Sequence, residues 1–364
     1  MDRPLLSICI PTWNRSDCFL KECLDSIVSQ FDDQDVYEQV EIVVSDNAST
    51  DNTEEVVKEY QKKFDNIKYL KINQGVSGGL NWDNAIINST GKYINTMGDD
   101  DIYLPGSLKK ILSVFSTEDD FGVMAVTHVP FTNKNIEFPD EYTGKFKKIP
   151  AEELAKNFFS INDKAVMEKN IQLGPCFMFF KGDVAREMKK TTGYFWKDPI
   201  CDHWAIFGSL HSQDFLVFYD CPIVAYRVHP GNHLLIKYKK EVIGKLLENF
   251  LTKYNKNFNL FPGTSFTNLI YLGMQDIQHH FPGYKKFPIN TDKLLTVHIN
   301  DVFHSDFPFL EKTKYMVESF LLIKKNKFVY GLNFLFAGLK FFVKRIIKVG
   351  LNGIRRIILP EKQK

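Results

Sequence analysis

Four short apolar runs occupy the first third of the chain, and each is followed by a polar loop and then by apolar residues at helical spacing. A continuous apolar run of this length is typical of a strand that is buried on both faces. Strands that alternate with helices predict an α/β fold, in which a Rossmann-like, mostly parallel sheet is flanked by helices. The expected strands are Leu5–Ile10, Val40–Val44, Ile67–Ile72 and the stretch that begins at Gly91.

The middle of the chain has a less regular pattern. Phe121–Val126 and Cys176–Phe180 are apolar enough to predict two more buried strands. Asn133–Lys148 is polar and predicts a loop, whereas Leu154–Phe159 predicts a short helix. The charged triplet Lys181–Asp183 after the last strand predicts a surface turn.

Apolar residues return at helical spacing beyond about residue 236, and the last part of the chain is strongly basic. We therefore expect three parts. Residues 1–235 would form the α/β domain and residues 236–311 a C-terminal helical extension. Residues 312–364 would form a basic amphipathic tail.

Composition alters this picture mainly through the distribution of charge. The 364 residues are 44% hydrophobic and 25% charged, as in a globular protein. The formal net charge is only +2, yet residues 312–364 hold 13 Lys and Arg against two acids. Along Lys340–Arg356 the cationic side chains fall on one helical face and bulky apolar side chains on the other. This pattern is typical of a helix in an anionic membrane surface; packing on the protein's own body is the alternative.

Other partners and compartments are less favoured by the sequence. No motif for reading nucleic acid accompanies the basic tail, so we expect no nucleic-acid partner. No apolar run reaches the roughly 18 residues of a membrane span, and no signal-peptide pattern precedes the first strand. The six cysteines include no CxxC pair and are expected to be reduced. The expected location is cytoplasmic, peripheral on the inner face of the plasma membrane.

Polar residues follow each expected strand and would meet at one edge of the sheet. Thr12 and Arg15 follow the first strand, Asp46 follows the second, Gly78 follows the third, and Asp99–Asp101 follow the fourth. Ligands of open α/β sheets bind at this edge. Three adjacent carboxylates need a divalent cation or basic side chains between them. The alternative is a solvated acidic turn in which Asp101 caps the next helix.

The loops exclude two familiar nucleotide sites and favour a third kind. No GxxxxGK[ST] phosphate loop occurs, and the first strand is not followed by GxGxxG. A mononucleotide with a diphosphate and a metal ion fits the residues better.

Several ordered motifs over residues 5–235 resemble those of the inverting nucleotide-sugar glycosyltransferases of family 2, which have the GT-A fold. Ile10–Arg15 matches the opening IPTYNR of that family, and Asp46–Thr53 matches DDGSTDNT. Asn73–Gly75 matches the NxG turn. Gly91–Ile94, followed by the acidic triplet and Leu104–Pro105, matches the block that carries the metal site.

The resemblance implies roles for the donor-side residues. Pro11, Thr12 and Arg15 would line the nucleotide pocket, and Asp46 would accept a hydrogen bond from the base. Gly78, at the start of the next helix, would belong to the same nucleotide-sugar site.

The resemblance also implies a metal site in the acidic triplet. Asp99 would approach the ribose or the donor sugar, and Asp100 would bind Mn²⁺ or Mg²⁺. Two positions depart from the family pattern. Gly98 stands where the DxD motif has its first Asp, and Leu80 stands where an Arg often follows the NxG turn.

A candidate catalytic base lies in Thr192–Phe207, which resembles the GxFD…EDxxL segment of the family. By that resemblance Asp202 would take the proton from the acceptor hydroxyl, with a pKa somewhat raised by aromatic neighbours. The alternative is that Asp202 only caps a helix. His203 is the nearest alternative base, and Asp198 is a weaker one.

The segment Tyr226–Asn232 resembles the YRxHxxN ending of the family. Arg227 and His229 are two positions apart on a strand and therefore share a face. His229 would be the last protein ligand of the metal, and Arg227 would neutralise phosphate charge as the nucleoside diphosphate leaves.

Together these motifs predict an inverting glycosyltransferase of the bacterial surface-polysaccharide type. It would move a sugar from a nucleoside-diphosphate sugar to a hydroxyl of a glycan or a lipid-linked acceptor. Two alternatives remain open. A sugar nucleotidyltransferase would usually have a glycine-rich loop after the first strand, which is missing here. A non-catalytic nucleotide-sugar-binding protein is compatible with Gly98.

Overall fold

The fold is known from a computed structural model and is best taken in two compact units. One unit comprises Met1–Asn232 with Gly273–Ile289, and the other comprises His233–Leu272 with Asn290–Lys364. His229 and residues 324–364, which hold most of the expected tail, lie outside the described residues. The structure describes residues 3–16, 19–117, 121–127, 129–132, 135–138, 141–162, 173–228, 243–245, 247–248, 251–252, 258–263, 265–305 and 307–323.

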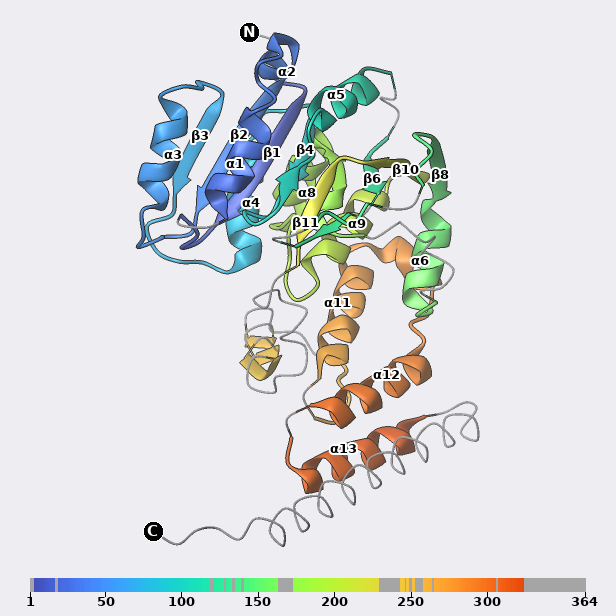
Figure 1. Ribbon diagram of the computed structural model, residues 1–364. Helices are drawn as coiled ribbons and strands as arrows, with labels where there is room; N and C mark the ends of the chain where they lie inside the picture. Colours follow the sequence, from blue (N-terminus) through green and yellow to red (C-terminus); the bar gives the residue numbers. More distant parts are fainter. Residues whose placement is uncertain are drawn as a thin grey trace, which may run out of the picture. The chain divides into compact units, whose positions relative to one another are not determined.

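An eight-stranded sheet forms the centre of the first unit, in the order β3-β2-β1-β4-β9-β6-β10-β8 (Figure 1). The four strands from β3 to β4 are parallel, as their alternation with helices predicts. β9 runs antiparallel between β4 and β6, β10 is parallel to β6, and β8 is an antiparallel edge strand. The strands are β1 Leu6–Thr12, β2 Val40–Asp46, β3 Ile67–Lys71, β4 Tyr93–Thr96, β6 Val123–Thr127, β8 Phe146–Pro150, β9 Met178–Lys181 and β10 Phe215–Pro222.

Helices follow the strands along the chain, which confirms the expected α/β fold. In the first unit they are α1 Leu20–Val28, α2 Gln34–Gln39, α3 Thr53–Gln61, α4 Gly78–Ile87, α5 Ser107–Thr117, α6 Ala151–Phe159, η1 Pro175–Phe177, α8 Gly182–Thr192, α9 Cys201–Leu210 and η3 Pro282–Lys286.

A second, three-stranded sheet positions the segment after the acidic triplet. It consists of β5 Ile102–Tyr103, β11 Val224–Arg227 and β7 Pro130–Phe131, with β11 in the middle. β5 pairs antiparallel with β11, so that Ile102 lies opposite Ala225. This pairing brings two segments that are more than a hundred residues apart in the sequence to the same place.

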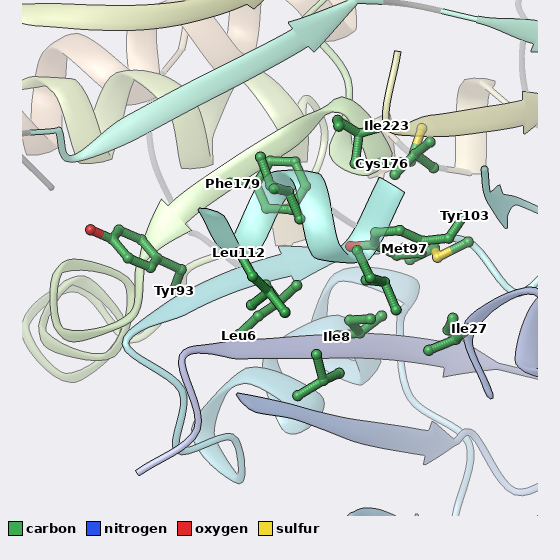
Figure 2. Close-up of a cluster of buried hydrophobic side chains, with 14 of the residues drawn as sticks. Leu6, Ile8, Ile27, Tyr93, Met97, Tyr103, Leu112, Cys176, Phe179 and Ile223 are labelled. Atoms are coloured by element: carbon green, nitrogen blue, oxygen red, sulfur yellow. The ribbon is translucent and has the colours of Figure 1, made fainter. Parts of the chain in front are cut away.

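The main core of this unit lies between one face of the large sheet and the helices α1 and α5. Figure 2 shows Leu6 and Ile8 of β1 near Ile27 of α1 and Leu112 of α5. Met97, directly after β4, is fully buried in the same cluster. Complete burial of such a side chain stabilises the fold by about 1.5–3 kcal/mol. Met97 therefore fixes the point at which the acidic residues leave the sheet.

Two parts of this unit differ from the prediction. β8 lies partly inside Asn133–Lys148, where a loop is expected; its side chains are almost all exposed, so it has no apolar alternation to detect. α8 begins at Gly182, where a surface turn is expected. Its buried residues Ala185 and Met188 are separated by charged ones, which concealed the helical pattern.

The second unit is helical in its described part. α11 Phe266–His280 begins there and its last turns belong to the first unit, whereas α12 Thr291–His304 and α13 Phe309–Leu322 lie wholly in the second. Its small core includes Ile243, Leu247, Leu269 and Leu272. Among the described residues, no helix has the length and apolarity needed to cross a membrane.

Candidate active site

The carboxyl ends of the first strands meet as the sequence predicts. Thr12 ends β1 and lies in register with Asp46, which ends β2. Asn81, in the first turns of α4, donates to the Thr12 carbonyl over 3.4 Å and accepts from the Ser45 hydroxyl over 2.7 Å. The start of α4, which includes Gly78, is therefore held at the same edge of the sheet.

The acidic loop, defined here as Gly98–Asp101, joins this edge through Asp99. The Thr12 hydroxyl donates to the Asp99 carboxylate over 2.7 Å. The carboxylates of Asp100 and Asp101 turn back over Gly98: a Cβ added to Gly98 would lie 2.7 Å from Asp100 Oδ1 and 2.8 Å from Asp101 Oδ2. A side chain at position 98 would therefore displace both carboxylates from these positions.

Electrostatic repulsion within the acidic loop is not fully compensated. Burial raises the pKa of Asp99 to about 6; the hydrogen bond from Thr12 opposes this shift, and repulsion from Asp100 adds to it. Burial and repulsion from Asp100 raise the pKa of Asp101 to about 8. Carboxyl groups in this condition favour the approach of a cation.

The donor set suits a hard divalent cation, because it consists of carboxylate oxygens. Within the described residues, however, no three His, Cys, Asp or Glu side chains are placed to hold a metal together. An ion bound through Asp100 would therefore need further ligands, such as phosphate oxygens of the nucleotide or residues outside the described part of the chain. Mg²⁺ in nucleotide sites is commonly bound in this way, through one or two carboxylates plus phosphate oxygens.

Arg227 holds the acidic loop from the other side. Its backbone N–H donates to Asp101 Oδ1 over 3.0 Å, and its Nε donates to the Asp100 carbonyl over 3.0 Å. One terminal nitrogen pairs with Glu22 at 2.5 Å, and the guanidinium lies 4.4 Å from the ring centre of Phe131. Only 3% of Arg227 is exposed. In this structure it clamps the loop, and its contact with a diphosphate stays a prediction.

The loop after β1 contributes a second arginine. Arg15 lies 5.1 Å from the ring centre of Phe19, and Arg227 lies 5.0 Å from the same ring. Arg15 also lowers the pKa of Asp99 by charge attraction, although less than burial raises it. Pro11 is buried within β1. The structure thus brings Arg15 together with the acidic loop.

Asp46 has a local role that the sequence did not indicate. It is fully buried, and it accepts hydrogen bonds from the Ser49 N–H at 2.9 Å and from the Tyr69 hydroxyl at 2.5 Å. Burial, together with this bond, raises the pKa of Tyr69. The carboxylate therefore shapes the loop after β2, and its contact with a nucleobase stays a prediction.

Asp51 ties the loops after β1 and β2 together and was missed by the sequence analysis. One of its oxygens accepts from the backbone and hydroxyl of Ser16, the other from the backbone and hydroxyl of Thr53. Short polar residues that bond nearby backbone are typical of such loops, so the run Asp46–Thr53 itself was the available signal.

Asp202 lies in the first turn of α9, and 32% of its side chain is exposed. It accepts hydrogen bonds from the backbone N–H of His203 at 2.9 Å and from the imidazole Nδ1 at 3.0 Å. Burial raises its pKa, but attraction to His203 and these hydrogen bonds outweigh burial and lower the pKa below its usual value. The expectation of a raised pKa is therefore wrong. The N-cap position belongs to Ile200, so Asp202 does not cap the helix.

The base segment, defined here as Phe195–Asp202, is packed against the start of α4. The Trp196 carbonyl oxygen lies 2.6 Å from the position that a Cβ on Gly79 would occupy, so only glycine fits there. Asp198 Oδ1 lies 3.7 Å from the same position. The first turns of α4 therefore contact both the strand ends and the segment that carries Asp202.

Comparison with known proteins identifies a sequence family and several similar chains. The sequence model of glycosyl transferase family 2 matches residues 7–186. An uncharacterized glycosyltransferase of Methanocaldococcus jannaschii is 31% identical over 159 residues, which cover 44% of this chain and 52% of that protein. The GalNAc(5)-diNAcBac-PP-undecaprenol beta-1,3-glucosyltransferase of Campylobacter jejuni is 29% identical over 177 residues, which cover 45% of this chain and 53% of that protein. The chain thus spans about half the length of these relatives.

Among solved structures, the crystal structure of Staphylococcus aureus TarS 1-349 in complex with UDP-GlcNAc is similar to this chain, with a TM-score of 0.49 and 15% sequence identity. The alignment covers 91% of this chain and 79% of that one.

Proposed function

Because this chain belongs to glycosyl transferase family 2 and is a transferase, we propose that it moves a sugar from a nucleoside-diphosphate sugar to an acceptor hydroxyl by a single inverting displacement. The observation that carries the proposal is the acidic loop at the carboxyl ends of parallel strands. It is bonded to Thr12 on one side and clamped by Arg227 on the other. Open α/β sheets bind their ligands at such an edge.

The donor would lie against the loops after β1, β2 and β4. Thr12 and Arg15 belong to the first of these loops, and Gly78 begins the helix that packs against them. Asp99 is the carboxylate that Thr12 orients, so it is the natural contact for the ribose or the donor sugar. Arg15 would stabilise negative charge on the diphosphate.

A divalent ion, Mn²⁺ or Mg²⁺, fits this arrangement through Asp100, with His229 as the expected further protein ligand. When bound, the ion would neutralise charge on the leaving diphosphate. The protein's own part is to hold the acidic loop in place, which the bonds from Thr12 and Arg227 do without the ion.

Asp202 would be the general base. It would take the proton of the acceptor hydroxyl while that oxygen attacks the anomeric carbon from the side opposite the nucleotide. The bond from the anomeric carbon to the diphosphate breaks in the same step, and the nucleoside diphosphate leaves. The lowered pKa keeps Asp202 ionised at neutral pH, as a base must be, and the partly exposed side chain is accessible to an acceptor.

The acceptor would be a lipid-linked or polysaccharide glycan at the inner face of the plasma membrane. The Campylobacter jejuni relative is named for an undecaprenol-linked acceptor. The basic tail supports contact with an anionic surface. On α13, Leu310 and Leu321 are 79% and 66% exposed and lie about three helical turns apart, on one face.

A thermal-shift screen of UDP, GDP, CDP and dTDP, each with and without Mn²⁺, tests donor binding. One nucleotide should raise the melting temperature more than the others, and Mn²⁺ should enlarge that shift. A ligand at 100 times its Kd stabilises a protein by about 2.7 kcal/mol, which such a screen detects. If no nucleotide shifts the melting temperature, the proposed donor site is wrong.

The Asp202→Asn variant tests the base. It should keep the nucleotide-dependent thermal shift and lose transfer, because the amide cannot accept the proton. Asp198→Asn, in the same segment, is the matched comparison and should retain most of the transfer rate. Undiminished transfer by Asp202→Asn would exclude it as the base, and loss in Asp198→Asn alone would move the role to Asp198.

A further inference from the structure

A buried ion pair joins the base segment to the end of α11. Lys197 and Asp276 form a short charge-assisted hydrogen bond, and their side chains are 1% and 2% exposed. The Lys197 ammonium also lies 4.4 Å from the ring centre of Trp204, in the helix that carries Asp202. Asp276 pairs in addition with His280 at 3.3 Å. Both partners belong to the first structural unit, which includes residues 273–289.

A second buried carboxylate also holds the base segment. On the other side, Asp83 of α4 accepts hydrogen bonds from the backbone N–H groups of Phe195 and Trp196, at 3.1 and 2.8 Å. The segment that leads to Asp202 is therefore bonded to α4 through backbone amides and to α11 through Lys197. Asp83 precedes the base segment in the sequence, and Asp276 follows it.

A buried ion pair contributes little net stability, because removing two charges from water costs about as much as their attraction returns. The main effect of such a pair is on geometry, because a short bond between buried charged groups fixes the positions of both side chains relative to each other. Burial raises the pKa of Asp276, but bonds from His280 and Lys197 outweigh it and lower the pKa, which keeps the carboxylate ionised. Lys197 thus remains bonded to a fixed anion close to Trp204.

We propose that Lys197 and Asp276 are positioning residues for glycosyl transfer, which fix the base segment so that Asp202 faces the acceptor. The proposal rests on the proposed function, in which Asp202 is the base. It gives residues 273–289 a part in catalysis, although they lie beyond the 7–186 match to the family. A displaced base lowers the rate of proton transfer without weakening donor binding, which involves other loops.

The Lys197→Met/Asp276→Leu double variant is the first test. Removing both charges leaves neither Lys197 nor Asp276 as an unpaired buried ion, and His280, which loses its contact with Asp276, is 22% exposed, so the protein should remain folded. We expect kcat to fall about 10- to 100-fold, as for a small misplacement of a catalytic group. The KM for the donor and the nucleotide-dependent thermal shift should not change. Lys197→Arg, which preserves the charge pair, should recover most of kcat.

A matched control separates positioning from stability. Val57→Ala removes buried contacts in α3, away from the base segment, and should lower the melting temperature while kcat stays within about twofold at temperatures below unfolding. Asp276→Glu provides a second variant that keeps both charges but lengthens the contact; it should also lower kcat.

Three results decide the matter. A loss of kcat in both Asp276 variants, with donor KM unchanged and recovery in Lys197→Arg, supports the proposal. A kcat within twofold of the parent in folded variants overturns it, as does a loss equal to that of Val57→Ala at matched stability. Asp202→Asn, measured in parallel, distinguishes the two hypotheses, because full transfer by that variant refutes the base itself rather than its positioning.

Discussion

Replacement of Arg227 by Lys separates two roles that the same residue would play. The resemblance of the sequence motif implies contact between Arg227 and the diphosphate, whereas the structure places its side chain against the Asp100 carbonyl, Glu22 and the ring of Phe131. Lys keeps the positive charge but loses the planar group and the Nε–H. The backbone bond from residue 227 to Asp101 is unaffected, so the change is confined to the side chain.

The expected loss of stability follows from these contacts. The bond from Nε to the Asp100 carbonyl has a charged donor and is partly buried, and such a bond stabilises the folded state by about 1.5–3 kcal/mol. The Glu22 carboxylate is 53% exposed, so that ion pair adds at most about 1 kcal/mol. For a domain of about 250 residues, each kcal/mol lost from the free energy of unfolding lowers the melting temperature by roughly 2–4 °C. Together these contributions are about 1.5–4 kcal/mol, so the ligand-free melting temperature should fall by roughly 3–16 °C.

The assay is thermal unfolding without ligand, followed by nucleotide titration with Mn²⁺. Arg186→Lys is the matched control, because Arg186 also donates to backbone carbonyls, those of Ser89 and Gly91 at 3.3 and 3.2 Å, but outside the acidic loop. It should lose stability and keep its nucleotide affinity. Arg227→Lys should lose both. If Arg227→Lys melts at the parent temperature and only nucleotide affinity falls, the clamp is refuted and Arg227 is a phosphate ligand.

Three further changes probe the charges and the surface of the protein. His203→Ala removes a group that lowers the pKa of Asp202. The pKa of Asp202 should therefore rise, and the acid limb of the pH profile of kcat/KM should move to higher pH. An acid limb at the same pH as in the parent protein would contradict the pairing of Asp202 with His203. Gly98→Ala places a Cβ within 3 Å of two carboxylate oxygens. It should lower the free energy of unfolding by about 1–3 kcal/mol and weaken Mn²⁺-dependent nucleotide binding. A melting temperature and nucleotide affinity equal to those of the parent protein would contradict the crowding at this position. Deletion of residues 324–364 should reduce cosedimentation with anionic vesicles but not alter the weak binding to neutral ones, and full binding without these residues would eliminate the tail as the membrane contact.

Local patterns were sufficient to predict the sheet edge. The strands that end at Thr12 and Asp46 are buried on both faces, so each is visible in the sequence as a continuous apolar run, Leu5–Ile10 and Val40–Val44. Parallel strands then place their carboxyl ends together without further information. The acidic loop was predicted for the same reason, because it directly follows the fourth of these strands. β8 lacks such a run and was missed.

The partners of the site residues were not predictable in this way. Glu22 and Arg227 are separated by 205 positions, and Lys197 and Asp276 by 79. No periodicity connects residues so far apart, and each pair depends on the whole topology between them. The lowered pKa of Asp202 was missed for a related reason. Burial does raise the pKa of Asp202, but charge attraction and hydrogen bonds from the adjacent His203 outweigh that effect.

The acidic loop and the base segment, which would serve the two sides of the proposed reaction, are held in place by different parts of the chain. Thr12 and Arg227 hold the acidic loop, where the donor would lie, whereas Asp83 and Asp276 hold the base segment. Arg227 and Asp276 both lie beyond the 7–186 match to the family, so a family 2 domain that ended there would lack one anchor on each side. Because α4 contacts both the strand ends and the base segment, it would set the spacing between donor and base under the proposed function. Under the proposed function, a relative with another C-terminal part would have to hold its base by other contacts, even where its donor loops are the same.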